Sequence, residues 1–177
     1  MPSGRTHDAI TLILAAPVFG LTYAATANLV MGIAVTAAFV FCGLMFGPDL
    51  DTLSKQYARW GIFRLLWFPY RSIFKHRSRW SHGLIFGTLF RVVYCMGVVT
   101  LVAFLVFVVA EAIWGGHVPG FSAFTEAWRQ IGVFMRGTFG ANILPAVFFG
   151  MWIGAASHTF ADMAGTYVKT GRVTEFL

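Results

Sequence analysis

Long apolar stretches separated by short polar segments dominate the chain. Four of them, at residues 9–28, 30–47, 84–114 and 140–160, carry almost no charge. A helix needs about 20 mainly apolar residues to cross a bilayer, so each stretch is long enough to be a membrane span. The third is longer than one crossing requires and is expected to tilt or project from the bilayer. The pattern predicts an all-α, multi-pass membrane protein with a four-helix bundle and one domain over residues 1–177.

The short links between the stretches predict how the helices are connected. Thr26–Asn28 separates the first two stretches, which predicts an antiparallel hairpin. Gly47-Pro48 ends the second stretch, because proline cannot continue a helix. Small residues one turn apart let membrane helices approach closely. Three such pairs predict a tight bundle: Gly43/Gly47, Gly83/Gly87 and Gly150/Gly154.

Aromatic and basic residues alternate between the second and third stretches, over residues 59–75. This mixture is typical of the membrane interface, where rings lie at headgroup depth and cations face phosphates. Pro69 divides the segment into two short pieces. We expect an interfacial anchor, and a role in substrate binding is compatible with it. Arg91, in the first turns of the third stretch, is expected to extend to the cytoplasmic interface.

Composition supports a membrane location and argues against a nucleic-acid partner. Hydrophobic residues make up 58% of the chain, against about 45–50% in soluble domains. The net charge is +6, and the loop after the second stretch holds seven of the thirteen basic residues: Lys55, Arg59, Arg64, Arg71, Lys75, Arg77 and Arg79. By the positive-inside rule, this loop and both termini are cytoplasmic in a bacterial inner membrane. The first stretch also resembles a signal peptide, but Asp8 offsets Arg5, and we expect the helix to be retained.

Candidate metal ligands gather at the ends of the apolar stretches. All four aspartates and four of the five histidines fall into four clusters: His7-Asp8, Asp49-x-Asp51, His76-x5-His82 and His158-x3-Asp162. Imidazole nitrogen and carboxylate oxygen are the ligands of catalytic divalent metals. With four spans and cytoplasmic termini, all four clusters lie on the cytoplasmic side. A bundle brings such helix ends together, so the sequence predicts a shared metal site.

Each cluster taken alone also has an explanation without metal. His158 and Asp162 share one helical face but are compatible with a polar helix end. An extended Pro-Asp-x-Asp segment can direct Asp49 and Asp51 to the same side, or it can be a simple turn. The pair around residues 76–82 can be interfacial histidines in a basic loop. Taken together, unpaired aspartates near a bilayer cost up to about 2.5–3.5 kcal/mol each, so a compensating charge is expected.

Several motifs resemble those of small bacterial membrane proteins described as metal-binding proteins or membrane-bound metal-dependent hydrolases. The motifs are Thr6-His7, Gly47-Pro48-Asp49-Leu50-Asp51, His76-Arg77-x3-Ser81-His82-Gly83 and Ser157-His158-x3-Asp162. The resemblance covers almost the whole chain and implies a helical fold similar to zinc-dependent phospholipase C and related nucleases. Carried over by position, the implied metal ligands are His7, Asp49, Asp51, His76, His82, His158 and Asp162.

These observations lead to a hypothesis about function. Two divalent metals, with zinc favoured over manganese or iron, are expected at the cytoplasmic membrane surface. There they would promote hydrolysis of a phosphoester, with a phospholipid or polyprenyl phosphate as the candidate membrane substrate. Arg77 and Arg79 are placed to neutralise phosphate charge. Asp8 is expected to fix the tautomer of His7, and Ser81 to cap the helix that follows.

Two other classes of function use the same features. A metal-stabilised structural or assembly protein would need the same ligands without catalysing a reaction, and the sequence does not separate it from a hydrolase. A metal transporter would need ionisable residues in the middle of its spans. The four stretches have virtually none, so transport ranks last.

Overall fold

The computed structural model describes residues 3–74, 80, 83, 86–116 and 120–171. Every secondary-structure element in these residues is a helix. The chain divides into two compact units, one formed by residues 1–92 with 145–177 and the other by residues 93–144.

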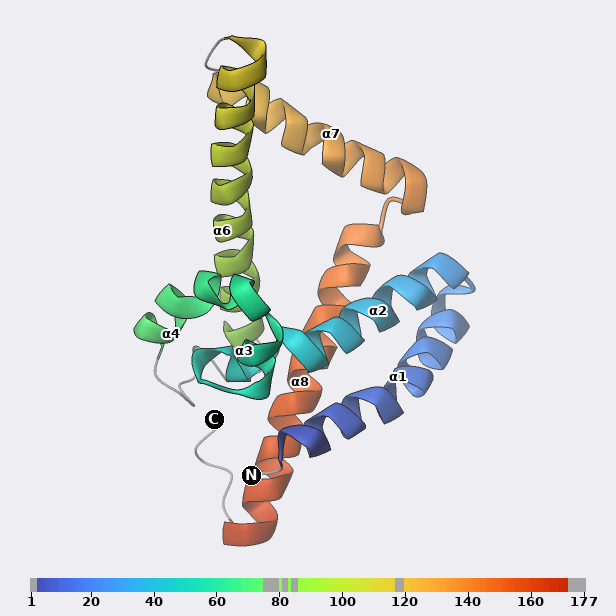
Figure 1. Ribbon diagram of the computed structural model, residues 1–177. Coiled ribbons are helices and arrows are strands. Elements are labelled where there is room, and N and C mark those ends of the chain that lie inside the picture. The colour runs from blue at the N-terminus through green and yellow to red at the C-terminus, as the bar shows by residue number, and fades with distance from the viewer. Residues whose placement is uncertain (1–2, 75–79, 81–82, 84–85, 117–119, 172–177) are drawn as a thin grey trace. The chain divides into compact units, whose positions relative to one another are not determined.

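The first unit is organised by a helical hairpin. Helix α1 (Gly4–Thr26) and helix α2 (Leu29–Met45) are joined by a tight turn in which Ala27 is left-handed, with φ 48°. Asn28 then caps α2, because its side chain accepts a hydrogen bond from the Met31 backbone N–H at 3.1 Å. Figure 1 shows this hairpin beside α8 (Ile143–Thr170). The antiparallel hairpin expected from the short link is therefore present.

Glycines allow the hairpin and α8 to approach one another at backbone distance. A Cβ atom added at Gly154 would lie 2.5 Å from the Phe39 carbonyl oxygen of α2, and one added at Gly150 would meet the Val35 carbonyl. Within the hairpin, a Cβ at Gly43 would lie 2.5 Å from the Thr11 side chain of α1. Two of the three predicted small-residue pairs thus contribute to close packing. The contact between α2 and α8 determines where the polar residues of α8 lie relative to the hairpin.

Short helices follow α2 and replace the extended segment that the sequence suggested. Pro48–Asp51 forms the 3₁₀-helix η1, followed by α3 (Lys55–Arg59), η2 (Gly61–Trp67) and α4 (Phe68–Ile73). Proline at the first helical position has the φ angle that a helix needs and lacks only an N–H that would stay unpaired there. Asp49 and Asp51 therefore lie on a tight helical turn rather than on an extended strand.

The aromatic-basic segment has both a buried and an exposed side. Trp67 and Tyr70 are buried, and their rings meet edge to face at 5.7 Å. Ile62, Phe63 and Phe68 are more than half exposed. The segment therefore supplies part of the core of the first unit, and its exposed apolar side chains remain suited to a membrane interface.

Arg91 lies in the core of the first unit, which corrects the expectation that it extends to the interface. Its side chain is 1% exposed, and its Nη2 atom donates to Thr88 Oγ1 at 3.3 Å. Burial raises the pKa of Tyr70, and the nearby Arg91 guanidinium opposes that rise. Polar groups within the fold therefore accommodate the guanidinium, so that the side chain has no need to reach the headgroups.

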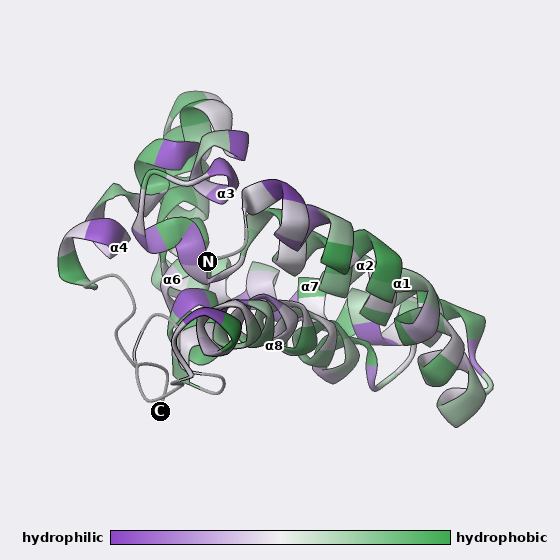
Figure 2. Ribbon diagram, turned by 90° about the horizontal axis from the view of Figure 1, so that it is seen from below, coloured by the Kyte–Doolittle hydropathy of each residue, from purple (hydrophilic) through white to green (hydrophobic). Residues whose placement is uncertain are grey.

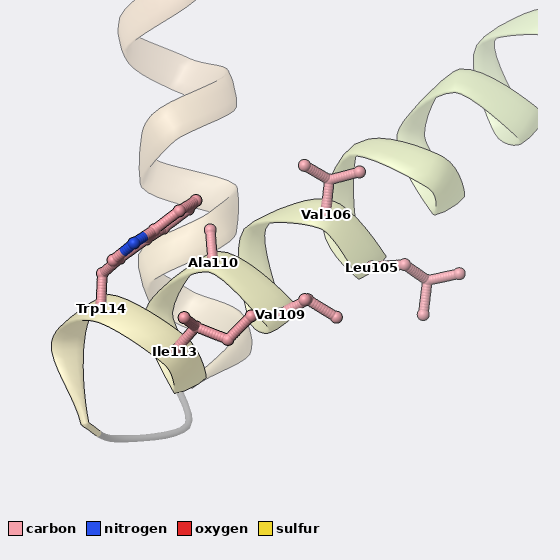
Figure 3. A pocket seen from close by; sticks show the side chains of 6 residues that line it. All are labelled: Leu105, Val106, Val109, Ala110, Ile113 and Trp114. Carbon is pink, nitrogen blue, oxygen red and sulfur yellow. The ribbon is translucent and has the colours of Figure 1, made fainter.

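The second unit contains the main part of α6 (Phe86–Ala110), the π-helix η3 (Glu111–Gly115) and α7 (Phe121–Phe139). Phe124 of α7 is buried against α6, with its ring centroid 5.1 Å from that of Phe104. Apolar side chains of α6 and η3 line a shallow groove, from Leu105 to Trp114 (Figure 3). Helix α7 is an addition to the four helices predicted from the sequence.

Four helices among the described residues are long and apolar enough to cross a membrane: Gly4–Thr26, Leu29–Asp51, Phe86–Gly115 and Ile143–Thr170. Their number agrees with the four predicted spans. Figure 2 shows the ribbons of α1 and α2 as largely hydrophobic. Helix α8 extends ten residues past the predicted end at residue 160, so the polar residues of its second half lie within the helix rather than at its end.

Candidate metal centre

Two distant parts of the chain meet in a buried polar cluster. His7 comes from the first turns of α1, and His158 and Asp162 come from one face of α8. Their side chains are 5%, 4% and 1% exposed. One ligand atom from each residue lies within 4.8 Å of the others. The cluster is therefore a candidate metal centre in the interior of the first unit.

The Asp162 carboxylate lies beside the two stacked histidines, with one oxygen near the Nε2 atom of each. His7 Nε2 is 3.2 Å from Asp162 Oδ1, and His158 Nε2 is 3.7 Å from Asp162 Oδ2. The two imidazole rings are stacked, with centroids 3.8 Å apart and planes 8° from parallel. The three side chains thus form a compact arrangement of two imidazoles and one carboxylate.

Asp49 adds a fourth group at the edge of the cluster. Its Oδ2 atom lies 3.4 Å from His158 Nε2, and its side chain is 25% exposed. His7, His158 and Asp162 are therefore buried, and Asp49 of η1 is the one partly exposed group of the four. A catalytic metal site needs an accessible side for its substrate, whereas a structural site is closed.

The chemistry of these residues fits a divalent metal. Among the described residues, His7 Nδ1, His158 Nε2 and both carboxylate oxygens of Asp162 have no hydrogen-bond partner, although all are buried. Such groups are costly unless an ion or a hydrogen bond compensates them. Two ligand atoms on one tetrahedral zinc lie about 3.4 Å apart, and the separations here are 3.2, 3.4 and 3.7 Å. The site thus matches the ligand types and the ligand spacing of such an ion.

Gln56 of α3 holds the other side of the His158 ring. Its Nε2 atom donates to the Gly43 carbonyl at 2.8 Å and lies 3.3 Å from His158 Nδ1. With the amide placed in this way, His158 Nδ1 is the acceptor and the ring proton lies on Nε2. Binding a metal through Nε2 requires that proton to move to Nδ1 and the Gln56 amide to turn. A Cβ atom at Gly47 would collide with this amide. Gln56 Oε1 has no hydrogen-bond partner among the described residues and is the acceptor that a His158 Nδ1–H would use.

Replacing Gln56 by leucine should weaken metal binding about 10–100-fold, the effect usual for losing a partner that orients a metal-ligating histidine. Leucine has a similar size but cannot hold the His158 ring by hydrogen bonding. Isothermal titration with zinc in detergent solution measures the change. The matched control is Gln130→Leu, which makes the same replacement on the exposed face of α7 and should leave the affinity unchanged. An unaltered affinity in Gln56→Leu would remove Gln56 from the site.

A salt bridge holds the first turns of α1, which carry His7. Arg59 donates to both carboxylate oxygens of Asp8, at 2.9 and 2.6 Å, and to the Leu44 carbonyl at 2.6 Å. The carboxylate raises the pKa of Arg59. A bidentate pair of this kind fixes orientation as well as charge. Asp8 was predicted as a partner of the His7 ring, and its carboxylate instead joins α1 to α3.

The seven predicted ligands fall into three groups in the structure. His7, His158 and Asp162 form the cluster, with Asp49 beside His158. Asp51 is buried in η1 and does not belong to the group of three. The predicted His76 and His82, together with Arg77, Arg79 and Ser81, lie outside the described residues.

Two residues at the site were absent from the sequence prediction. Arg59 was counted only among the basic residues of a loop, and Gln56 was not considered. Both precede the aromatic segment in α3, and neither lies in a cluster of histidine and aspartate. The sequence does show Gln56 as a polar residue shortly after Asp51. Its contact with His158, 102 positions away, depends on the fold.

Comparison with known proteins assigns the chain to a family. A search of curated proteins and a search of solved structures found no significant match, so the likeness to zinc-dependent phospholipase C and the hydrolase activity stay predictions. The profile of one family, described as "Uncharacterized metal-binding protein (DUF2227)", matches residues 2–172. That range contains all the residues of the candidate metal centre. The chain belongs to this family of uncharacterized metal-binding proteins.

Proposed function

We propose that this protein is a metal-dependent hydrolase that cleaves a phosphoester at the cytoplasmic face of a bacterial inner membrane. One observation carries the proposal: a buried carboxylate that faces two stacked histidines, with a partly exposed aspartate beside them. The family description supports the binding of metal. The accessible aspartate favours catalysis over a closed structural site.

The arrangement favours two ions, with zinc as the first candidate. The lone pair of an imidazole lies in the ring plane, so two nearly parallel rings direct their lone pairs along separate planes. Asp162 presents a different oxygen to each ring and would therefore supply one ligand atom to each ion. His7 with Asp162 would hold one ion, and His158 with Asp162 and Asp49 the other. When bound, such ions supply Lewis acidity to a phosphoester and lower the pKa of an attacking water.

The residues of the chain have distinct roles in this proposal. Asp49, the accessible ligand, lies where a substrate would enter, and Gln56 orients His158. Arg59 and Asp8 hold the helix turn that carries His7. The predicted ligands in residues 76–82 would complete the coordination. Arg77 and Arg79 would neutralise the phosphate, as the bidentate geometry of guanidinium allows.

A lipid-linked phosphoester is the substrate class that suits this placement. The four candidate spans support a membrane location, and the basic loop supports a cytoplasmic face for the site. The exposed Ile62, Leu65 and Phe68 follow η1 closely along the chain. They would rest among acyl chains and keep the site at the depth of lipid phosphates.

A metal-stabilised structural protein is the second candidate. The specific observation in its favour is that the cluster joins α1 to α8. His158 and Asp162 lie 151 and 155 positions after His7 in the chain. An ion bound there would tie the two ends of the chain together and contribute to folding. Turnover of a substrate distinguishes the two candidates.

The proposal is tested by phosphodiesterase and phosphomonoesterase assays on purified protein in lipid nanodiscs, with zinc or manganese. We expect hydrolysis of at least one phosphoester from a panel of phospholipids, polyprenyl phosphates and nitrophenyl phosphates. Asp49→Asn should lower the rate at least about 100-fold, the size of effect for a lost electrostatic group at a reacting centre. Glu126→Gln, the same chemical change on α7, should have the wild-type rate. Stoichiometric metal without hydrolysis of any of these substrates would instead support the structural role.

A further inference from the structure

Helix α7 is amphipathic, with one mainly apolar and one mainly polar half; Val133 on the polar half and Thr138 on the apolar half are the exceptions. With about 3.6 residues per turn, the apolar half contains Phe121, Phe124, Trp128, Ile131, Phe134, Met135 and Phe139. The polar half contains Ser122, Thr125, Glu126, Arg129, Gln130 and Arg136. None of the four candidate spans includes this helix. Its division into an apolar and a polar half is the pattern of a helix that lies between an apolar environment and water.

The apolar half is only partly covered within the second unit. Phe124 packs on Phe104 and Phe107 of α6 and is 5% exposed. Farther along the helix, Ile131 is 52% exposed and Phe134 is 63% exposed. The uncovered residues continue the same half of the helix as Phe124. Among the described residues, the contact with α6 therefore buries Phe124, whereas Phe121, Ile131 and Phe134 stay exposed and Trp128 and Met135 are half-buried.

The polar half pairs its one acidic residue with one of its two arginines. Glu126 accepts hydrogen bonds from Arg129 at 2.7 and 2.6 Å and from Gln130 at 2.7 Å. These contacts lower the pKa of the exposed Glu126 carboxyl to about 2. Arg136 is then the one cation of this half that has no acidic partner in α7. Such a surface is suited to water and lipid headgroups.

The position of α7 in the chain indicates which medium covers the apolar half. Helix α7 connects the candidate span Phe86–Gly115 to the candidate span Ile143–Thr170. If each of these helices crosses the bilayer once, the end of the first and the beginning of the second lie at the same membrane face. Trp114, at the end of the first span, is 82% exposed and is of the residue type that marks this level. The 19-residue helix between them is thereby held at the membrane surface.

We propose that α7 lies along the bilayer surface, with Ile131 and Phe134 inserted among the acyl chains and its polar half facing water. The inference goes beyond the proposed hydrolase and rests on the membrane location included in that proposal. A helix held in this way would fix the depth of both spans that it connects. The insertion comes mainly from apolar area, because Glu126 neutralises Arg129 and leaves Arg136 as the one cation of α7 without an acidic partner in that helix.

Site-directed spin labelling of the full chain in nanodiscs of neutral phosphatidylcholine tests the placement. Single cysteines are introduced at Ile131 and Phe134 on the apolar half, and at Ser122 and Thr125 on the polar half. A fifth label at Leu101, which is 58% exposed in the middle of α6, reports whether the protein is in the bilayer. The background carries Cys42→Ala and Cys95→Ala. Collision of each label with oxygen and with a water-soluble nickel chelate gives its depth.

We expect the labels at positions 131 and 134 to lie about 5–10 Å below the headgroups and to lose contact with the nickel chelate. Labels at positions 122 and 125 should remain in contact with it. If all four α7 labels contact the chelate while the Leu101 label is in lipid, the membrane location holds and the inference about α7 is wrong. Spin–spin broadening at positions 131 and 134, with access to neither reagent, would show that a second copy covers the helix and would also overturn it. A Leu101 label in water would overturn both the membrane location and the inference.

Discussion

Replacing Asp162 by asparagine should abolish metal binding at the candidate centre. The carboxylate is 1% exposed and lies 3.2 Å from His7 and 3.7 Å from His158, so every proposed ion has it as a ligand. Asparagine keeps the shape but removes the charge. Losing a residue that only orients a metal ligand lowers metal affinity about 10–100-fold. Because Asp162 is itself a proposed ligand, we expect the affinity for zinc to fall by more than about 100-fold. Metal analysis of the purified protein and zinc titration measure the change.

Thermal unfolding provides a second measurement that does not depend on activity. An ion that binds only the folded protein stabilises it by about 2.7 kcal/mol when its concentration is 100 times the dissociation constant. The unfolding temperature of the wild type should therefore fall when a chelator is added, and that of Asp162→Asn should not change. Glu126→Gln is the matched control, because it also converts a carboxylate to an amide, and it should behave like the wild type. An Asp162→Asn protein with the metal content of the wild type would contradict the assignment of the centre.

Replacing Gly154 by alanine should destabilise the first unit and displace the metal ligands of α8. The added methyl group would lie 2.5 Å from the Phe39 carbonyl oxygen and 3.0 Å from Cys42 Cβ. The carbonyl belongs to the backbone of α2 and cannot turn away as a flexible side chain can. We expect a loss of about 1–3 kcal/mol in the free energy of unfolding, the usual range for overpacking. His158, one turn farther along α8, should bind zinc more weakly because the helix has to move.

Gly20→Ala is the control for this experiment. Gly20 lies inside α1, in the same unit, and an added Cβ there has nothing within 4 Å. Alanine favours the helix over glycine by about 0.5–1 kcal/mol, so the control should be as stable as the wild type or slightly more stable. Chemical unfolding in detergent micelles compares the two variants. Equal stability of Gly154→Ala and Gly20→Ala would mean that α2 and α8 do not pack at backbone distance.

The four long apolar helices and the residue types of the candidate metal centre could be predicted from the sequence. Four apolar stretches are evident because hydropathy is a local property that is averaged over about 20 residues. The ligand types are evident because aspartate and histidine are rare in so apolar a chain. The His158 and Asp162 pair also follows from the sequence, since residues four positions apart share a helical face. Helix α7 was missed because its average hydropathy is modest and its signal lies in the periodicity of its apolar positions.

The tertiary structure decided which of these groups meet. Asp8 and His7 are neighbours in sequence, yet Asp8 pairs with Arg59 whereas His7 contacts Asp162. Arg91 is buried rather than extended to the surface. Each of these outcomes depends on the distance between segments that are far apart in the chain.

The sequence by itself therefore determined the helical character, the number of candidate spans and the presence of metal-ligand chemistry. Only the packing of α1, α2 and α8 decided that His7, His158 and Asp162 form one cluster and that Gln56 holds its edge. The physical reason is that hydropathy and helical period are properties of neighbouring residues. Coordination geometry instead requires atoms from distant segments to lie within a few ångströms, and glycine contacts between helices set that distance.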